Sequence, residues 1–190
     1  MRFHVVKIAM TAAIAIVAVA FNVLSPAAAL AASASEIDRS ATQSLTSLYK
    51  HTPGAKELAD KAVAVLVFPK IVKGGFIIAG QFGDGALRKN GKSVAYYRSL
   101  AASYGFQAGI QAYGYVLFFM DDASLRYLDK SEGWELGVGP SLVVLDAGFG
   151  KNVSTTTMQK GVYAFIFDQT GLMGGLGIQG TKITKINPNP

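Results

Sequence analysis

Apolar side chains recur at helical spacing soon after residue 35. They stand three or four positions apart, at Ile37, Ala41, Leu45 and Leu48. This period predicts an amphipathic helix from Glu36 to about Lys50, and its polar face leaves packing on the domain and contact with a membrane both open. Ser35 is expected to cap the helix, with Asp38 in the acidic position of a capping box.

A second short helix and two strands are expected next. Thr52 and Pro53 supply a cap and a first-turn proline for a helix through Lys61. The apolar, β-branched run from Ala62 to Phe68 predicts a buried strand that ends at Pro69, and residues 74–83 continue in strand form.

A hairpin is predicted at Asn90-Gly91, because this dipeptide favours a two-residue turn and stands between two strand-like runs, residues 86–89 and 92–97. Glycine and aromatic residues then alternate from Ser103 to Met120, which indicates a strand with bends or close backbone contacts.

The last part of the chain has the signature of one short helix and several strands. Asp121 or Asp122 is expected to cap a helix to about Lys130, with Leu125 and Leu128 facing inward. Further strands are expected at Trp134–Gly139, Ser141–Ala147, Gly161–Phe167 and Met173–Ile186. Helices followed by strands predict an α+β fold: short N-terminal helices and a strongly curved, glycine-rich antiparallel sheet.

The first 31 residues resemble a secretory signal peptide. Arg2, His4 and Lys7 precede the apolar run from Ile8 to Leu24, and Ala29-Leu30-Ala31 provides small residues for cleavage. We expect a mature chain from about Ala32 that is periplasmic or secreted and peripheral to a membrane, with an uncleaved anchor as the alternative. Residues 32–190 then suffice for one domain.

Composition narrows the chemistry. The chain has no cysteine, which excludes disulfides, thiolate metal sites and a lipid-modified cysteine. Loss of Arg2 and Lys7 with the signal would lower the net charge from +6 to +4. The basic residues concentrate between Lys50 and Arg98, where nine stand against three acidic ones.

This basic segment supplies the candidate ligand contacts. Anionic lipid headgroups attract such residues by about 1 kcal/mol each near a charged surface, whereas a solvated face that only maintains solubility is the alternative. The candidate lipid-binding residues are Lys70, Lys73, Arg88, Lys89 and Lys92.

Catalytic and cofactor motifs are weak by comparison. His51 is the one histidine left after signal removal, and Asp121 and Asp122 are adjacent carboxylates that suit capping better than paired acid–base work. Residues 85–93 miss the spacing of a phosphate loop by one residue, and residues 175–180 fit Gly-x-Gly-x-x-Gly without room for the helix that must follow. We expect no cofactor, no metal and no nucleic-acid partner, although Ser154–Thr157 could hydrogen-bond a phosphate.

Several ordered motifs are similar to the SYLF domain family over about Glu36 to Pro188. They are Val67-Phe68-Pro69-Lys70, Gly133–Pro140, Ser154–Thr157 and Asp168–Met173, together with the glycine-aromatic run. The resemblance implies a non-enzymatic phospholipid-binding module. It implies a phosphoinositide preference in eukaryotic members, actin binding in the yeast branch and export in bacterial relatives. The amphipathic helix that eukaryotic members are thought to use at membranes maps to residues 36–50.

Three hypotheses follow for the function. The first is an exported module that docks on anionic phospholipid through its basic surface, with actin not expected as a partner. The second is a structural or self-assembling protein of the cell envelope, acting through sheet edges and protein contacts. The third is a hydrolase that uses Asp121, Asp122 or His51, and it has the least support.

Overall fold

The computed structural model describes residues 32–75, 78–104, 109–129, 133–145, 160–171 and 180–190. By its contacts the chain divides into residues 1–31 and residues 32–190, and every described range belongs to the second unit. The expected signal segment and Ser154–Thr157 lie outside the described residues. The helices are α2 (Ala34–His51), α3 (Pro53–Lys61), α4 (Asp122–Leu125) and the 3₁₀ turn η1 (Arg126–Asp129). The strands are β1 (Ala64–Gly75), β2 (Ile78–Lys89), β3 (Lys92–Tyr104), β4 (Gly109–Phe119), β5 (Trp134–Glu135), β6 (Leu142–Leu145), β7 (Val162–Gly171) and β8 (Lys182–Ile186).

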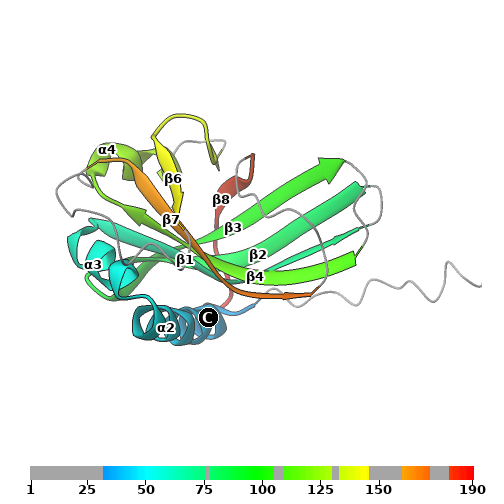
Figure 1. Ribbon diagram of the computed structural model, residues 1–190, viewed down its shortest axis with the longest axis horizontal. Coiled ribbons are helices and arrows are strands. Elements are labelled where there is room, and N and C mark those ends of the chain that lie inside the picture. The colour runs from blue at the N-terminus through cyan, green and yellow to red at the C-terminus, as the bar shows by residue number, and fades with distance from the viewer. Residues whose placement is uncertain (1–31, 76–77, 105–108, 130–132, 146–159, 172–179) are drawn as a thin grey trace, which may run out of the picture. The chain divides into compact units, whose positions relative to one another are not determined.

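Eight strands form one curled sheet within the described ranges, in the order β5-β8-β3-β2-β1-β4-β7-β6 (Figure 1). Among the first four strands, β1 pairs with β2 and with β4, and β2 pairs with β3, and all these pairings are antiparallel. The prediction of a purely antiparallel sheet is wrong, because β6 runs parallel to β7. A parallel pair needs a connection of about a dozen residues or more, and residues 146–159 give the chain that length.

Helix α2 begins two residues earlier than predicted. Ser33 is its N-cap, and Ser33 and Glu36 form the capping box in place of Ser35 and Asp38. The backbone N–H of Ser33 donates to Glu36 at 2.9 Å, and this bond lowers the pKa of the Glu36 carboxyl. The carboxylate of Asp38 therefore takes no part in capping α2 and is available for other hydrogen bonds. The second helix spans Pro53–Lys61 as expected, although the side chain of Thr52 makes no cap hydrogen bond.

Pro69 does not end the first strand. Strand β1 continues to Gly75 across a bulge, where Phe68 pairs with Tyr115 and Ile71 pairs with Tyr113. Proline has no N–H to donate, and a bulge interrupts the ladder at the position where that donor would be missed. The strand predicted for residues 74–83 is accordingly divided between the end of β1 and the start of β2.

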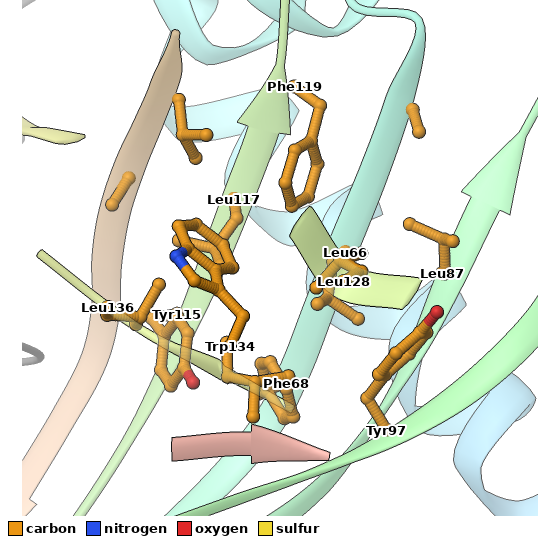
Figure 2. Packing of buried hydrophobic residues seen from close by; sticks show 14 of the residues in the cluster. Leu66, Phe68, Leu87, Tyr97, Tyr115, Leu117, Phe119, Leu128, Trp134 and Leu136 are labelled. Carbon is orange, nitrogen blue, oxygen red and sulfur yellow. The ribbon is translucent and has the colours of Figure 1, made fainter. Parts of the chain in front are cut away.

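The sheet has two packed faces. The inner face carries a cluster of large side chains that α4, η1 and β5 cover, among them Phe68, Tyr115, Leu128 and Trp134 (Figure 2). The outer face is covered by α2 and α3, whose buried residues meet alternate residues of the same strands, such as Val65 and Val67. Adjacent positions therefore belong to opposite faces, as strand geometry requires.

Most of the remaining elements are shorter than predicted, whereas β7 continues past the expected end at Phe167 to Gly171. Asp121 caps α4, and Leu125 and Leu128 are buried as expected. Strand β5 has only two residues, and β6 has four. Strand β8 begins at Lys182, and the earlier part of its predicted range lies outside the described residues. No helix in the described ranges is both long and apolar enough to span a membrane.

Candidate functional site

The hairpin between β2 and β3 presents two lysines at its tip. Asn90 and Gly91 form the turn with φ values of +50° and +77°, the left-handed region that asparagine and glycine tolerate best. Lys89 and Lys92 are direct partners in the ladder and are both exposed. Neither has an ion-pair partner among the described residues. The predicted turn is confirmed, and it concentrates two cations at one point.

Arg88, the third predicted cation of the hairpin, serves a different purpose. Its Nη2 donates to the carbonyl of Asp38 at 2.9 Å and to the hydroxyl of Thr42 at 2.7 Å. The carboxylate of Asp38 accepts from Ser93 at 2.6 Å and from Tyr96 at 3.0 Å. These bonds join the base of the hairpin to α2. Arg88 is therefore a structural residue that acts through Nη2, whereas its buried Nε has no hydrogen-bond partner among the described residues.

A cavity of about 430 Å³ lies between α2, α3 and the hairpin. Its polar groups include Arg88, Asn90 and Lys56, and Lys56 forms an ion pair with Asp60. Burial raises the pKa of Tyr49 to about 12, so its phenol is a neutral hydrogen-bond donor at physiological pH. The apolar part of the lining comes from Leu45, Ala59, Ala62, Val63, Ala64 and Val65. A site with one apolar side and several donors suits a small polar or anionic group attached to an apolar one.

The other two predicted cations lie far from the hairpin. Val65 pairs with Arg88, and Lys70 and Lys73 stand five and eight residues further along β1, about 16 and 26 Å at 3.3 Å per residue. Lys70 is exposed in the bulge. Lys73 is half-buried and pairs with Gln81 and Gln111, which are both buried. The five candidate residues therefore form two groups and no single patch.

Polar side chains on the inner face form a network that the sequence did not predict. Gln81 donates to Thr181 at 2.8 Å and accepts from Tyr113 at 2.9 Å. Tyr115 donates to Ser99 at 2.9 Å, and burial raises the pKa of both tyrosines, that of Tyr113 to about 12. The sequence places glutamine beside or near glycine in these strands, at Gly80-Gln81 and Gly109-Ile110-Gln111, but this pattern does not show which face of the sheet a glutamine occupies.

The residues considered for catalysis are occupied with local structure. Asp121 accepts from the backbone N–H of Gly161 and Ser124, each at 2.7 Å, and from the Ser124 hydroxyl at 3.0 Å. Burial raises the pKa of Asp121, but these bonds outweigh it and hold the pKa below its usual value. His51 is exposed near the end of α2, with Nδ1 2.9 Å from the Ser47 carbonyl. The described residues contain no group of three ligating side chains suited to a metal ion.

Comparison with known proteins bears on the second half of the chain. Residues 100–188 match the family Ysc84, described as Las17-binding protein actin regulator, which is the SYLF domain. No curated protein matches the chain. The matched residues begin in β3 and include β4, β7 and β8, the strands that build the glycine-aromatic part of the sheet. The family is one of lipid-binding or actin-related modules in general and is not known for enzymes. The resemblance inferred from the motifs is confirmed for the second half of the chain: residues 100–188 match the SYLF domain family.

Proposed function

We propose that this protein is an exported, non-catalytic phospholipid-binding module that docks on anionic membrane lipids through its basic surface. The observation that carries the proposal is the pair of exposed lysines, Lys89 and Lys92, which have no ion-pair partner in the described part of the chain and stand on a hairpin whose base Arg88 fixes to α2. Because Arg88 holds the base of the hairpin to α2, the loop that presents the two lysines loses little freedom when it docks on a surface. Family membership supports a lipid ligand over an arbitrary anion.

The lipid class follows from the proposed export. A chain that enters the envelope meets phosphatidylglycerol or cardiolipin, which are anionic, and does not meet actin, whose regulation is what the family description mentions. The cavity beside the hairpin is positioned to receive part of a headgroup, since Asn90 and Gly91 line it and the tip lysines flank these two residues.

Vesicle co-sedimentation of the exported protein tests the proposal. Binding to phosphatidylglycerol-containing vesicles should exceed binding to zwitterionic vesicles and should fall as salt rises, because screening shortens the reach of surface charge. Lys89→Gln with Lys92→Gln reports on the hairpin, and Lys70→Gln reports on the bulge. Lys160→Gln with Lys185→Gln removes two charges from exposed positions outside the basic segment and serves as the control. Equal or absent binding to both vesicle types would refute the proposal.

Self-association in the envelope is the second candidate function. Strand β6 ends the described sheet and exposes Val143 and Val144 at 41% and 46%. An open edge strand with exposed apolar residues can pair with another chain. Sedimentation velocity across a range of protein concentrations, without lipid, decides this candidate: a concentration-dependent oligomer that Val144→Lys abolishes would support it, and a monomer throughout would exclude it.

A further inference from the structure

At one end of the sheet no described helix covers the outer face, which exposes large apolar side chains there. Val72 pairs with Phe82, and Phe82 pairs with Leu100, so these three side chains share one face of the sheet. Closer to the hairpin on the same strands, Val67 and Ala86 pack against α2 and α3, which identifies this face as the outer one. Exposure increases toward the end of the strands: it is 42–44% for Val72, Phe82 and Leu100, and 68% and 71% for Ile78 and Ile110. In Figure 1 the ends of β2, β3 and β4 extend beyond α2.

This end carries almost no charge. We define the uncharged end as residues 72–75, 78–83, 99–104 and 109–113, and its one charged residue is Lys73. Exposed edge strands in water are ordinarily protected by charged side chains, among other devices, and contiguous exposed apolar groups mark an interaction surface. The residues that follow Gly75 and Tyr104 in the sequence are uncharged as well: residues 76–77 are Phe-Ile, and residues 105–108 are Gly-Phe-Gln-Ala.

Charged residues return at a defined level. Lys70 stands five residues before Gly75, and Lys182 pairs with Leu100, four residues from Tyr104. At 3.3 Å per residue, both exposed lysines lie about 13–16 Å from the end. Other charged residues lie near this level: Glu135 pairs with Lys182, and Asp168 lies on β7. The ion pair between Arg98 and Asp84 also lies there, with the Arg98 guanidinium over the Phe82 ring.

We propose that the uncharged end inserts into the outer part of a lipid bilayer, with Ile78 and Ile110 among the inserted residues and with Lys70 and Lys182 at headgroup level. This inference rests on the proposed function, because it takes an anionic phospholipid membrane as the partner, but it places the contact at the end of β2 opposite the hairpin, with Lys70 and Lys182 instead of Lys89 and Lys92 at the headgroups. A surface that is apolar at its tip and charged behind it matches the change from hydrocarbon to headgroup and water. The one charge inside the uncharged end is a cation, which an anionic leaflet tolerates better than a carboxylate.

The backbone limits the insertion to a shallow one. Strand β8 pairs with β3 only from Tyr96 to Leu100, so the rest of the β3 edge has no partner strand within the described ranges. Unpaired backbone groups are costly in hydrocarbon. Entry by about 5–10 Å, as for other interfacial elements, immerses Ile78 and Ile110 and leaves most of that edge in the polar layer.

Cysteine labelling measures the insertion directly, because the chain has no cysteine of its own. Ile78→Cys, Ile110→Cys and the control Val94→Cys, which is 54% exposed near the hairpin, are each labelled with a solvent-sensitive fluorophore and mixed with vesicles of phosphatidylglycerol and phosphatidylcholine. We expect a blue shift and protection from an aqueous quencher at positions 78 and 110 but not at 94. In addition, unlabelled Ile78→Ser/Ile110→Ser should bind at least tenfold more weakly than Val94→Ser, with unchanged circular dichroism.

The other outcomes are distinguishable. Binding by sedimentation with no shift at 78 or 110, or with a shift only at 94, would overturn the insertion while leaving lipid docking intact. A shift at 78 and 110 that appears without vesicles and grows with protein concentration would show a second copy on this face, and would also overturn it. Failure to sediment with any vesicle would refute the proposed function itself.

Discussion

Glycines at two alternate positions of β2, Gly83 and Gly85, have a specific packing role. A Cβ added at Gly85 would lie 2.4 Å from the Val67 carbonyl oxygen and 2.6 Å from the Phe68 ring, and one added at Gly83 would lie 2.3 Å from the Lys70 oxygen. The β1 bulge therefore approaches β2 closely at these glycines. Glycine at a bulge or close backbone approach is expected from strand chemistry.

Gly85→Ala should consequently destabilise the protein by about 1–3 kcal/mol, the usual cost of overpacking. Gly80→Ala is the matched control, because nothing lies within 4 Å of its added Cβ and its φ is not left-handed; it should be neutral or stabilising by up to about 1 kcal/mol. Urea unfolding of both variants measures the difference. Equal effects would contradict the close approach at residues 67–68.

Asp121 predicts a dependence of stability on pH. Its folded-state pKa is below the unfolded value, so its contribution is complete above the unfolded pKa of about 3.9 and is lost as pH falls through the folded pKa. Asp121→Ala should lower the free energy of unfolding at pH 7 by about 2 kcal/mol through loss of the cap and its hydrogen bonds. The gap between wild type and variant should narrow below pH 4 in urea titrations, and a constant gap would contradict this role.

At the scale of elements, the attachment of α2 to the sheet depends on more than its apolar face. Ile37, Ala41 and Leu45 bury the helix against the outer face, while Arg88 and Asp38 link it to the hairpin by hydrogen bonds. The apolar contacts are visible in the period of the sequence. The polar link joins residues about 50 positions apart, and no local pattern indicates it.

Arg88→Gln should therefore lower the free energy of unfolding by about 1–2 kcal/mol, since it removes hydrogen bonds from a charged donor in a half-buried site. Lys89→Gln, one position further along, removes the same charge from an exposed side chain and should change stability by less than about 0.5 kcal/mol. Chemical denaturation of the two variants compares a structural cation with a free one. Equal changes in the free energy of unfolding would show that the hydrogen bonds of Arg88 do not stabilise the protein.

At the scale of the whole molecule, the tip of the hairpin and the uncharged end are opposite ends of β2. Lys89 and Ile78 are 11 residues apart on this strand, about 36 Å, which exceeds the Debye length of about 8 Å at physiological salt. When one end contacts a bilayer, charges at the other end contribute little. Substitutions at the two ends therefore report on separate contacts.

Trp134 provides a readout of the intact core during membrane binding. It is the one tryptophan of the chain, is 2% exposed on the inner face and donates to the Val138 carbonyl at 2.9 Å. Docking by either end should leave its emission maximum unchanged, because the inner face stays packed. Fluorescence titration with anionic vesicles tests this, with Trp134→Phe as the blank. A red shift would indicate that the sheet opens on binding.

The sequence predicted the elements whose signals are local. The helical period, the asparagine-glycine turn and the capping aspartate at residue 121 depend on neighbours a few positions away, and the structure confirms all three. The family motifs are likewise read along the chain, and the match over residues 100–188 confirms the resemblance in that range, which does not include the motif at Val67–Lys70. The basic segment was evident too, as a count of charges.

Only the tertiary structure decided where those charges and apolar residues face. Lys73 lies beside two buried glutamines, Arg88 is tied to α2, and Pro69 stands in a bulge because strands β2 and β4 set the register on both sides. The parallel pairing of β6 and the uncovered outer face depend on which strands meet after long connections. By itself the sequence determined composition and local conformation, whereas register and coverage arise from contacts between distant residues, which no local pattern encodes.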